Sequence, residues 1–129
     1  MRKQMKILIA LGAATIMTLS SAFTGFAQTG WVQNGNSWNY YNGNGEQAKN
    51  QWVISSGAWF WIDPDGTMAT NKWIDNSGNW YWVDGSGATV TGWHEINGKW
   101  YFFYKDFTMA VDTMIDSYYV GKDGAWVEK

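Results

Sequence analysis

The sequence predicts an all-β protein, a solenoid of about five tandem β-hairpins preceded by a signal peptide. Three observations lead to this class. Tryptophan is in large excess, with 11 residues among 129, and there are 15 glycines. Cysteine is absent, which excludes a disulfide scaffold and a thiolate metal site. Aromatic residues recur at a fixed interval through most of the chain, as they do in repeat architectures.

The first segment has the order of a secretory signal peptide. Arg2, Lys3 and Lys6 precede an almost wholly apolar run over residues 7–19, which is too short to span a bilayer core comfortably. Gly25 and Ala27 then supply the small side chains that a cleavage site needs. We expect residues 1–27 to be removed, leaving a domain over residues 28–129 with no membrane span. An uncleaved membrane anchor is the alternative.

Tryptophans mark the copies of the repeat. Trp31, Trp52, Trp73 and Trp93 follow one another at intervals of 21, 21 and 20 residues. A second tryptophan follows each of them after seven residues and a third aromatic residue after nine: Trp38, Trp59, Trp80 and Trp100, then Tyr40, Trp61, Trp82 and Phe102. A fifth, degenerate copy has Met114 in the first place. The copies therefore start near residues 30, 51, 72, 92 and 113.

Each copy contains two short strand candidates, because aromatic and β-branched residues gather at both ends of a turn signal. In the second copy the first strand begins at Trp52 and the second covers residues 59–62. Between them Ser56-Gly57 suits a hairpin, since glycine accepts the positive φ of a tight turn. A second turn follows at Asp65-Gly66. One hairpin cannot bury a face alone, so successive hairpins are expected to pack on one another.

The turn also predicts which residues face each other. The first tryptophan of a copy lies opposite the third aromatic, so the three aromatic residues share one face. The other face, with Val53, Phe60 and Ile62 in the second copy, resembles ordinary core. In the first copy Gly35 sits one place early, so its register need not follow the others.

The aromatic face suggests a binding surface. Three large rings per copy, with Asp75 and Glu95 on the same face of two copies, suit an aromatic cage for a quaternary ammonium. The carboxylates favour a cation over an uncharged sugar. The alternative is that the tryptophans only fill the space between hairpins.

The repeat resembles the choline-binding, or cell-wall-binding, repeat of Gram-positive secreted and surface proteins. The resemblance is carried by Thr91-Gly92-Trp93, by Asn97-Gly98-Lys99-Trp100-Tyr101-Phe102, by Gly57-Ala58-Trp59-Phe60-Trp61 and by Gly78-Asn79-Trp80-Tyr81-Trp82. It extends from Gly30 to about Trp126. It implies a left-handed solenoid with ligand sites at junctions between hairpins, each built from about three aromatic residues and often a loop methionine.

Carried onto this chain, the resemblance implies a set of ligand-binding residues: Trp31, Trp38, Tyr40, Trp52, Trp59, Trp61, Met68, Trp73, Trp80, Trp82, Trp93, Trp100, Phe102 and Met109. Gln47 and Thr89 replace the methionine in the first and third copies.

The resemblance implies a non-catalytic module that binds choline of teichoic acids, or a cell-wall polysaccharide, and is secreted to the cell wall. A glucan-binding module and a purely structural wall protein are the alternatives. The acidic net charge of -2 argues against nucleic acid. The only histidine, His94, is expected to be packed and satisfied. We expect no enzyme activity, cofactor or metal, although the turn acids Asp63 and Asp65 leave a weak calcium loop as an alternative.

Overall fold

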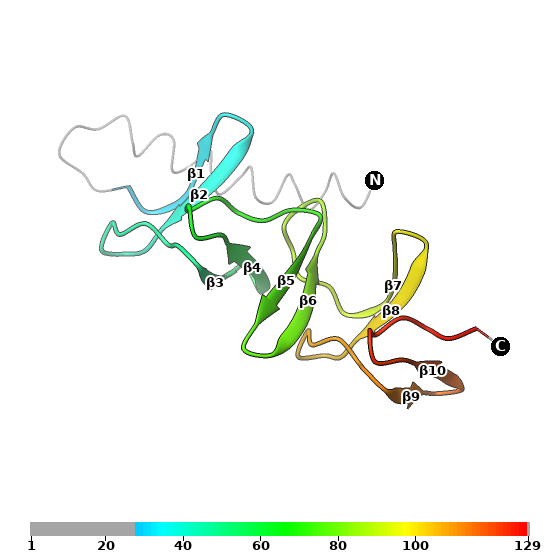
Figure 1. Ribbon diagram of the computed structural model, residues 1–129. Helices are drawn as coiled ribbons and strands as arrows, with labels where there is room; N and C mark the ends of the chain where they lie inside the picture. Colours follow the sequence, from blue (N-terminus) through cyan, green and yellow to red (C-terminus); the bar gives the residue numbers. More distant parts are fainter. Residues whose placement is uncertain (1–27, 129) are drawn as a thin grey trace. The chain divides into compact units, whose positions relative to one another are not determined.

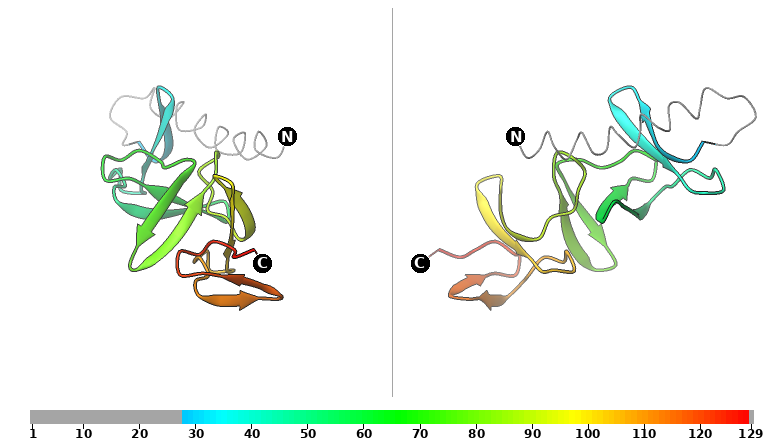
Figure 2. Two further views of the ribbon diagram at one scale, coloured as in Figure 1. Left: turned by 45° about the vertical axis from the view of Figure 1, so that its right-hand side comes forward. Right: turned by 180° about the vertical axis from the view of Figure 1, so that it is seen from behind.

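The computed structural model describes residues 28–128, and the expected signal peptide and its cleavage site lie outside these residues. The described chain forms ten strands and no helix, paired as five separate two-stranded sheets (Figure 1). The predicted all-β chain of five hairpins is thus confirmed. The strands are β1 (Gly30–Asn34), β2 (Ser37–Tyr41), β3 (Gln51–Ser55), β4 (Ala58–Ile62), β5 (Lys72–Asn76), β6 (Asn79–Val83), β7 (Gly92–Ile96), β8 (Lys99–Phe103), β9 (Thr113–Ile115) and β10 (Tyr118–Val120). Figure 2 shows each hairpin as its own ribbon, joined to the next by a loop.

The register of the regular hairpins is the one that the turn predicts. In β3–β4, Trp52 pairs with Trp61 and Ile54 pairs with Trp59. A two-residue loop connects the strands, and Ser56 has a φ of 51°. Both loop positions have positive φ, because Gly57 follows with a φ of 80°, and such a turn matches the twist of the two strands. The aromatic residues of a copy therefore share one face, as expected.

The first hairpin keeps this register, although its glycine sits one place early in the sequence. Trp31 pairs with Tyr40, and Gln33 pairs with Trp38. The reason is that its loop also has two residues. Gly35 takes the first loop position with a φ of 65°, where the second copy has Ser56, and the number of loop residues rather than the place of the glycine determines the pairing.

The fifth hairpin is shorter. In β9–β10, Met114 pairs with Tyr119 and Ile115 pairs with Tyr118, so each strand has three residues. Met114 holds the place of the first tryptophan, and Tyr119 holds the place of the third aromatic. The shortening explains why the aromatic spacing of this copy is compressed.

In three places a backbone hydrogen bond ties a hairpin to the loop that follows the next one. Met109 N–H donates to the carbonyl of Trp80 at 2.9 Å, and Trp126 N–H donates to the carbonyl of Trp100 at 2.8 Å. In the same way, Met68 N–H donates to the carbonyl of Trp38. The loop residue is thereby held beside the second tryptophan of the preceding hairpin.

The described chain divides into two compact units. The first covers residues 28–72 and 83–88, and the second covers residues 73–82 and 89–128. The core of the first unit contains Trp31, Trp38, Val53, Phe60, Ile62 and Met68. The core of the second unit contains Val90, Ile96 and Phe103, with Trp73, Trp82, Tyr101 and Met109 packed against it. Aromatic and β-branched side chains thus supply the core of a chain that has no leucine after residue 27.

Candidate ligand-binding pockets

The last two hairpins of the second unit form an aromatic pocket, which we call the Trp93 pocket. It has a volume of about 300 Å³ and is lined by Trp93, Trp100, Tyr118 and Trp126. Tyr118 lies edge-on to Trp93 and to Trp126, with ring centroids 5.8 Å apart in both pairs. Trp100 and Tyr118 remain 40% and 49% exposed. The rings therefore present free faces to a ligand.

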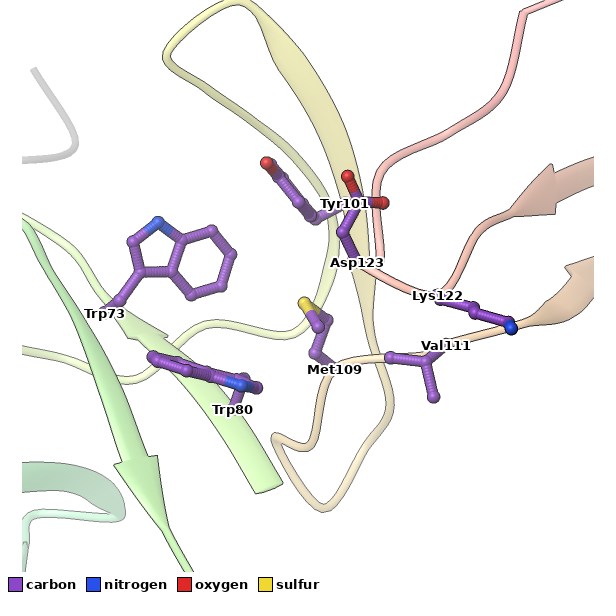
Figure 3. A pocket seen from close by; sticks show the side chains of 7 residues that line it. All are labelled: Trp73, Trp80, Tyr101, Met109, Val111, Lys122 and Asp123. Carbon is purple, nitrogen blue, oxygen red and sulfur yellow. The ribbon is translucent and has the colours of Figure 1, made fainter. Parts of the chain in front are cut away.

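A second pocket in the same unit, the Trp73 pocket, has a volume of about 410 Å³. Figure 3 shows its seven lining residues: Trp73, Trp80, Tyr101, Met109, Val111, Lys122 and Asp123. Tyr101 is edge-on to Trp73, with centroids 4.9 Å apart. Trp80 is also edge-on to Trp73 at 6.1 Å and is 43% exposed.

Both pockets use the same four places of the repeat. One hairpin contributes its first and second tryptophans, such as Trp73 and Trp80. The next hairpin contributes the aromatic residue directly before its third aromatic, here Tyr101, and its loop contributes Met109. The hydrogen bond from Met109 N–H to the carbonyl of Trp80 fixes the loop residue in place. The aromatic residues and Met109 of the Trp73 pocket therefore come from two consecutive hairpins, whereas Lys122 and Asp123 come from the loop after β10.

The charged side chains among the lining residues, Lys122 and Asp123, both belong to the Trp73 pocket. Asp123 Oδ1 accepts a hydrogen bond from the backbone N–H of Ala125 at 3.0 Å, which fixes this carboxylate at the turn. Burial of the Tyr101 hydroxyl, and secondly the negative charge of Asp123, raise the pKa of Tyr101 above its usual value. None of the described residues lining the Trp93 pocket is charged.

In the first unit the corresponding four residues are packed together. Trp31 is 2% exposed, and Trp38, Phe60 and Met68 are also buried. Trp31 lies edge-on to Phe60 at 5.1 Å, and its indole N–H donates to Ser55 Oγ at 3.1 Å. These rings serve as core of the first unit.

The third aromatic of each copy supports the first tryptophan. Ring centroids are 5.0 Å apart for Trp31 and Tyr40 and for Trp52 and Trp61, and 5.3 Å apart for Trp73 and Trp82 and for Trp93 and Phe102. All four pairs are edge-on. In the first unit Trp59 also lies edge-on to Trp52.

Among the expected ligand residues, the structure brings Trp73, Trp80 and Met109 together in one pocket, and Trp93 and Trp100 in the other. Trp82 and Phe102 lie outside the lining of both. Six lining residues are not among those expected from the sequence: the aromatic residues Tyr101, Tyr118 and Trp126, and also Val111, Lys122 and Asp123. Tyr101 corresponds to Phe60 of the second copy, and the alternation within one hairpin therefore places it on the core face. The spacing in the sequence could have identified Trp126 as a pocket residue. It follows Tyr119 by seven residues, just as Met68 follows Trp61.

Glu95 is the cross-strand partner of Trp100, as the register predicts, but neither Glu95 nor Asp75 contributes to the lining of the Trp73 pocket or the Trp93 pocket. Both carboxylates are exposed. Their strands place them beside the turns, whereas the loop after β10 brings Asp123 to the Trp73 pocket. The carboxylate at this pocket therefore comes from the fifth repeat, two repeats after the one that contributes Trp73.

Other polar groups have structural roles. His94 Nε2 lies 2.9 Å from the carbonyl of Thr91, and the ring lies beside Phe103, as expected for a packed histidine. Asp63 forms an ion pair with Lys72 at 3.0 Å, and Asp65 Oδ1 accepts the backbone N–H of Thr67. Within residues 28–128, no group of three or more His, Cys, Asp or Glu side chains is placed to hold a metal ion.

Two family models described as choline-binding repeats match the chain, one over residues 46–89 and the other over residues 90–128. The two matches run without interruption over most of the chain. The chain belongs to the choline-binding repeat family. The aromatic pockets thus lie between consecutive choline-binding repeats, and the resemblance inferred from the sequence is confirmed.

Several solved structures are similar. CbpJ from Streptococcus pneumoniae is 37% identical over 77% of this chain and 34% of its own, with a TM-score of 0.68. CbpF from Streptococcus pneumoniae, in complex with ipratropium, is 34% identical over 81% of this chain and 34% of its own, with a TM-score of 0.71. A multimodular pneumococcal cell-wall endolysin from phage Cp-1, complexed with choline, is 27% identical over 75% of this chain and 30% of its own, with a TM-score of 0.63.

The chain spans about a third of the length of these three proteins. A sequence search of curated proteins finds no match. Across residues 28–128 there is no helix long and apolar enough to cross a membrane.

Proposed function

We propose that this chain is a non-catalytic module that binds the quaternary ammonium group of choline in the Trp93 and Trp73 pockets. The observation that carries the proposal is the Trp93 pocket, where four aromatic side chains and no charged group surround the space. A trimethylammonium group is weakly hydrated and is attracted by the electronegative faces of aromatic rings. An uncharged lining of rings suits this cation better than it suits an anion or a metal ion.

Each contact is weak by itself. One cation over one ring contributes about 0.5–2 kcal/mol, and part of that gain is lost to ordering the ligand and its water. A single pocket is therefore expected to bind free choline weakly. A polymer that carries many choline groups engages several pockets at once, because the first bound group raises the effective concentration of the next. The module is thus suited to a surface dense in choline rather than to free choline.

We further propose that the natural ligand is choline on teichoic acid of the cell wall, and that the chain reaches it by secretion. The support is the resemblance to wall-binding repeats together with the order of residues 1–27. Residues 28–129 carry an excess of acidic residues, which disfavours attraction to the polymer through its phosphates. Binding would then depend on the ammonium groups.

The test is retention on a matrix that carries dense tertiary or quaternary amines. We expect the protein to be retained and to be eluted by millimolar choline, and we expect glucan oligosaccharides to leave it bound. Elution by glucan and not by choline would move the chain to the carbohydrate-binding alternative. No retention by either ligand would favour a purely structural wall protein.

A further inference from the structure

The first unit contains a pocket of its own, which we call the Gln51 pocket. It is formed by the end of β2, the loop that follows and β3, and it has a volume of about 460 Å³, in the usual range for small-molecule sites. None of its residues lines the Trp93 pocket or the Trp73 pocket, so it is a separate feature of the chain. The nine lining residues are Tyr40, Asn42, Glu46, Gln47, Ala48, Gln51, Trp52, Val53 and Ile54.

The first repeat differs from the second at two places that open this pocket. In the second repeat, Asp63 and Lys72 form an ion pair at 3.0 Å. Asn42 and Gln51 hold the equivalent places of the first repeat. Asn42 Nδ2 donates to Glu46 Oε1 at 2.9 Å, and Gln51 Oε1 accepts a backbone N–H of the loop at 3.3 Å. The two amide side chains are thus held by separate partners, and the space between the loop and β3 stays open.

Glu46 and Gln51 offer hydrogen bonds to a ligand in this space. Asn42 Oδ1 accepts the backbone N–H groups of Asn44 and Glu46 at 2.9 Å and 3.0 Å, so its amide is occupied in fixing the loop. The Glu46 carboxylate receives one hydrogen bond from Asn42 and retains lone pairs that accept others. The Gln51 oxygen is used by the backbone, and its Nε2 group has hydrogens to donate. A ligand therefore meets both a charged acceptor and a neutral donor.

Trp52 and Tyr40 supply the aromatic part of the pocket. Each ring is braced within its own hairpin, because Trp52 lies edge-on to Trp61 and Tyr40 lies edge-on to Trp31, with centroids 5.0 Å apart in both pairs. Both rings are half-buried. A fixed ring offers an electronegative face to C–H groups, which carry a small positive charge. The pocket thus combines an aromatic surface with hydrogen-bonding groups.

This combination distinguishes between classes of ligand. A quaternary ammonium neither donates nor accepts hydrogen bonds, so it would displace water from Glu46 and Gln51 without replacing the bonds. An alkylammonium ion donates to Glu46 and leaves the Gln51 donor without a partner. A pyranose has C–H groups on the faces of its ring and hydroxyl groups at its edge, and each hydroxyl both donates and accepts. It therefore matches the rings, the carboxylate and the amide together.

We propose that the Gln51 pocket binds a pyranose unit of a neutral oligosaccharide. Trp52 and Tyr40 lie against the sugar ring, and Glu46 and Gln51 bond to its hydroxyl groups. The chain then has a carbohydrate site in its first unit that is independent of the choline pockets in its second unit. Because Glu46 and Gln51 are exposed, water competes for each hydrogen bond, and we expect dissociation constants of about 1–10 mM.

NMR titration of the full chain reads the two units separately. The indole N–H signals of Trp52 and Trp100, assigned with the Trp52→Phe and Trp100→Phe variants, are followed during addition of maltotriose, cellotriose or di-N-acetylchitobiose. We expect at least one of these sugars to shift the Trp52 signal saturably and to leave the Trp100 signal in place. The choline affinity read at Trp100 should be the same with and without the sugar, because the sites are independent.

A matched pair of variants tests the carboxylate. Glu46→Gln keeps the size of the side chain and loses the charged acceptor, so it should weaken sugar binding at Trp52 about three- to tenfold. Glu95→Gln makes the same change at an exposed residue of the second unit and should leave sugar binding at Trp52 unchanged.

A triple variant tests the opening of the pocket. Asn42→Asp, Glu46→Thr and Gln51→Lys together copy the second repeat, where the ion pair of Asp63 and Lys72 holds these places. The new ion pair should close the pocket and abolish the sugar response of the first unit. The dispersion of the indole signals verifies that the variant is folded. If it does not fold, the comparison of Glu46→Gln with the parent still decides the inference.

Four results would overturn the inference: no shift of Trp52 by any of the three sugars up to about 100 mM, equal sugar affinities of Glu46→Gln and the parent, sugar binding by the folded triple variant, or competition between sugar and choline. A Glu46-dependent response of Trp52 to propylammonium, without a response to sugars, would reassign the pocket to a cation and also overturn it. A Glu46-dependent sugar response at Trp52 with no choline response at Trp100 would contradict the proposed function and support the carbohydrate site.

Discussion

The backbone N–H of Trp126 donates a hydrogen bond to the carbonyl of Trp100 at 2.8 Å. Met109 makes the same bond with Trp80 one repeat earlier. An indole ring therefore stands at the Trp93 pocket where a thioether stands at the Trp73 pocket. The exchange replaces a flexible, polarisable side chain with a rigid aromatic face, which attracts a cation more strongly.

Trp126→Met should weaken choline binding at the Trp93 pocket by about two- to tenfold, which corresponds to the loss of one cation–ring contact of about 0.5–1.5 kcal/mol. Trp126→Phe, which keeps a ring, should lose less. Both affinities can be read from the Trp100 indole signal. Equal binding by the two variants and the parent would show that Trp126 closes the pocket without contacting the cation.

Exposure separates pocket residues from core residues. Trp100 is 40% exposed and Trp31 is 2% exposed. Trp100→Ala should therefore lower retention on the amine matrix with a small loss of melting temperature. Trp31→Ala removes a buried aromatic side chain from the first unit and should cost about 3–5 kcal/mol of unfolding free energy.

The comparison is made well below the melting points, so that both variants are folded during the binding measurement. If Trp31→Ala, once folded, loses choline binding as strongly as Trp100→Ala, the packed set of the first unit is also part of a ligand site.

The hairpins could be predicted from the sequence because their causes are local. A two-residue turn with a glycine determines the pairing, and the alternation of side chains then puts Trp93 and Trp100 on one face. The rest of the pocket is not local. Tyr118 and Trp126 reach Trp93 from the next repeat, and their position depends on how two hairpins stack, which the alternation within one hairpin does not determine.

The hydrogen-bonded carboxylates of the turns should make the unfolding free energy depend on pH in the acid range. Asp106 Oδ1 accepts hydrogen bonds from Thr108 Oγ1 at 2.7 Å and from Thr108 N–H at 3.1 Å, and these bonds, the side-chain one first, lower the pKa of Asp106. Because the folded protein favours the charged carboxylate, the stabilisation is present above pH 4 or so, the usual Asp value, and is lost as the pH falls through the lowered pKa.

Thr108→Val should raise the pKa of Asp106 toward its usual value, as measured by the carboxyl chemical shift during an acid titration. The unfolding free energy of the variant should also depend less on pH below about 4. Asp65, whose pKa is lowered by Thr67 in the equivalent turn, is the internal reference and should be unchanged. An unchanged pKa of Asp106 in Thr108→Val would contradict the conclusion that the Thr108 side chain lowers it.

Close approach of the backbone to a loop side chain explains one glycine of the repeat. A Cβ atom on Gly87 would lie 2.7 Å from Met68 Sδ, and Gly87 has a φ of 86°. Gly57 has a similar φ of 80°, but a Cβ atom there would meet nothing within 4 Å. Gly87→Ala should therefore cost more stability than Gly57→Ala, which bears only the backbone strain of about 1–2 kcal/mol.

A double-mutant cycle isolates the steric part. Met68→Ala alone should cost about 2–5 kcal/mol because it leaves a cavity in the first unit. In the Met68→Ala background the cost of Gly87→Ala should fall to that of Gly57→Ala, because the Cβ atom then occupies space that the sulfur has left. Chemical denaturation of the four proteins gives the coupling energy. Additive costs would mean that Met68 moves aside without strain, and that Gly87 is required only for its positive φ.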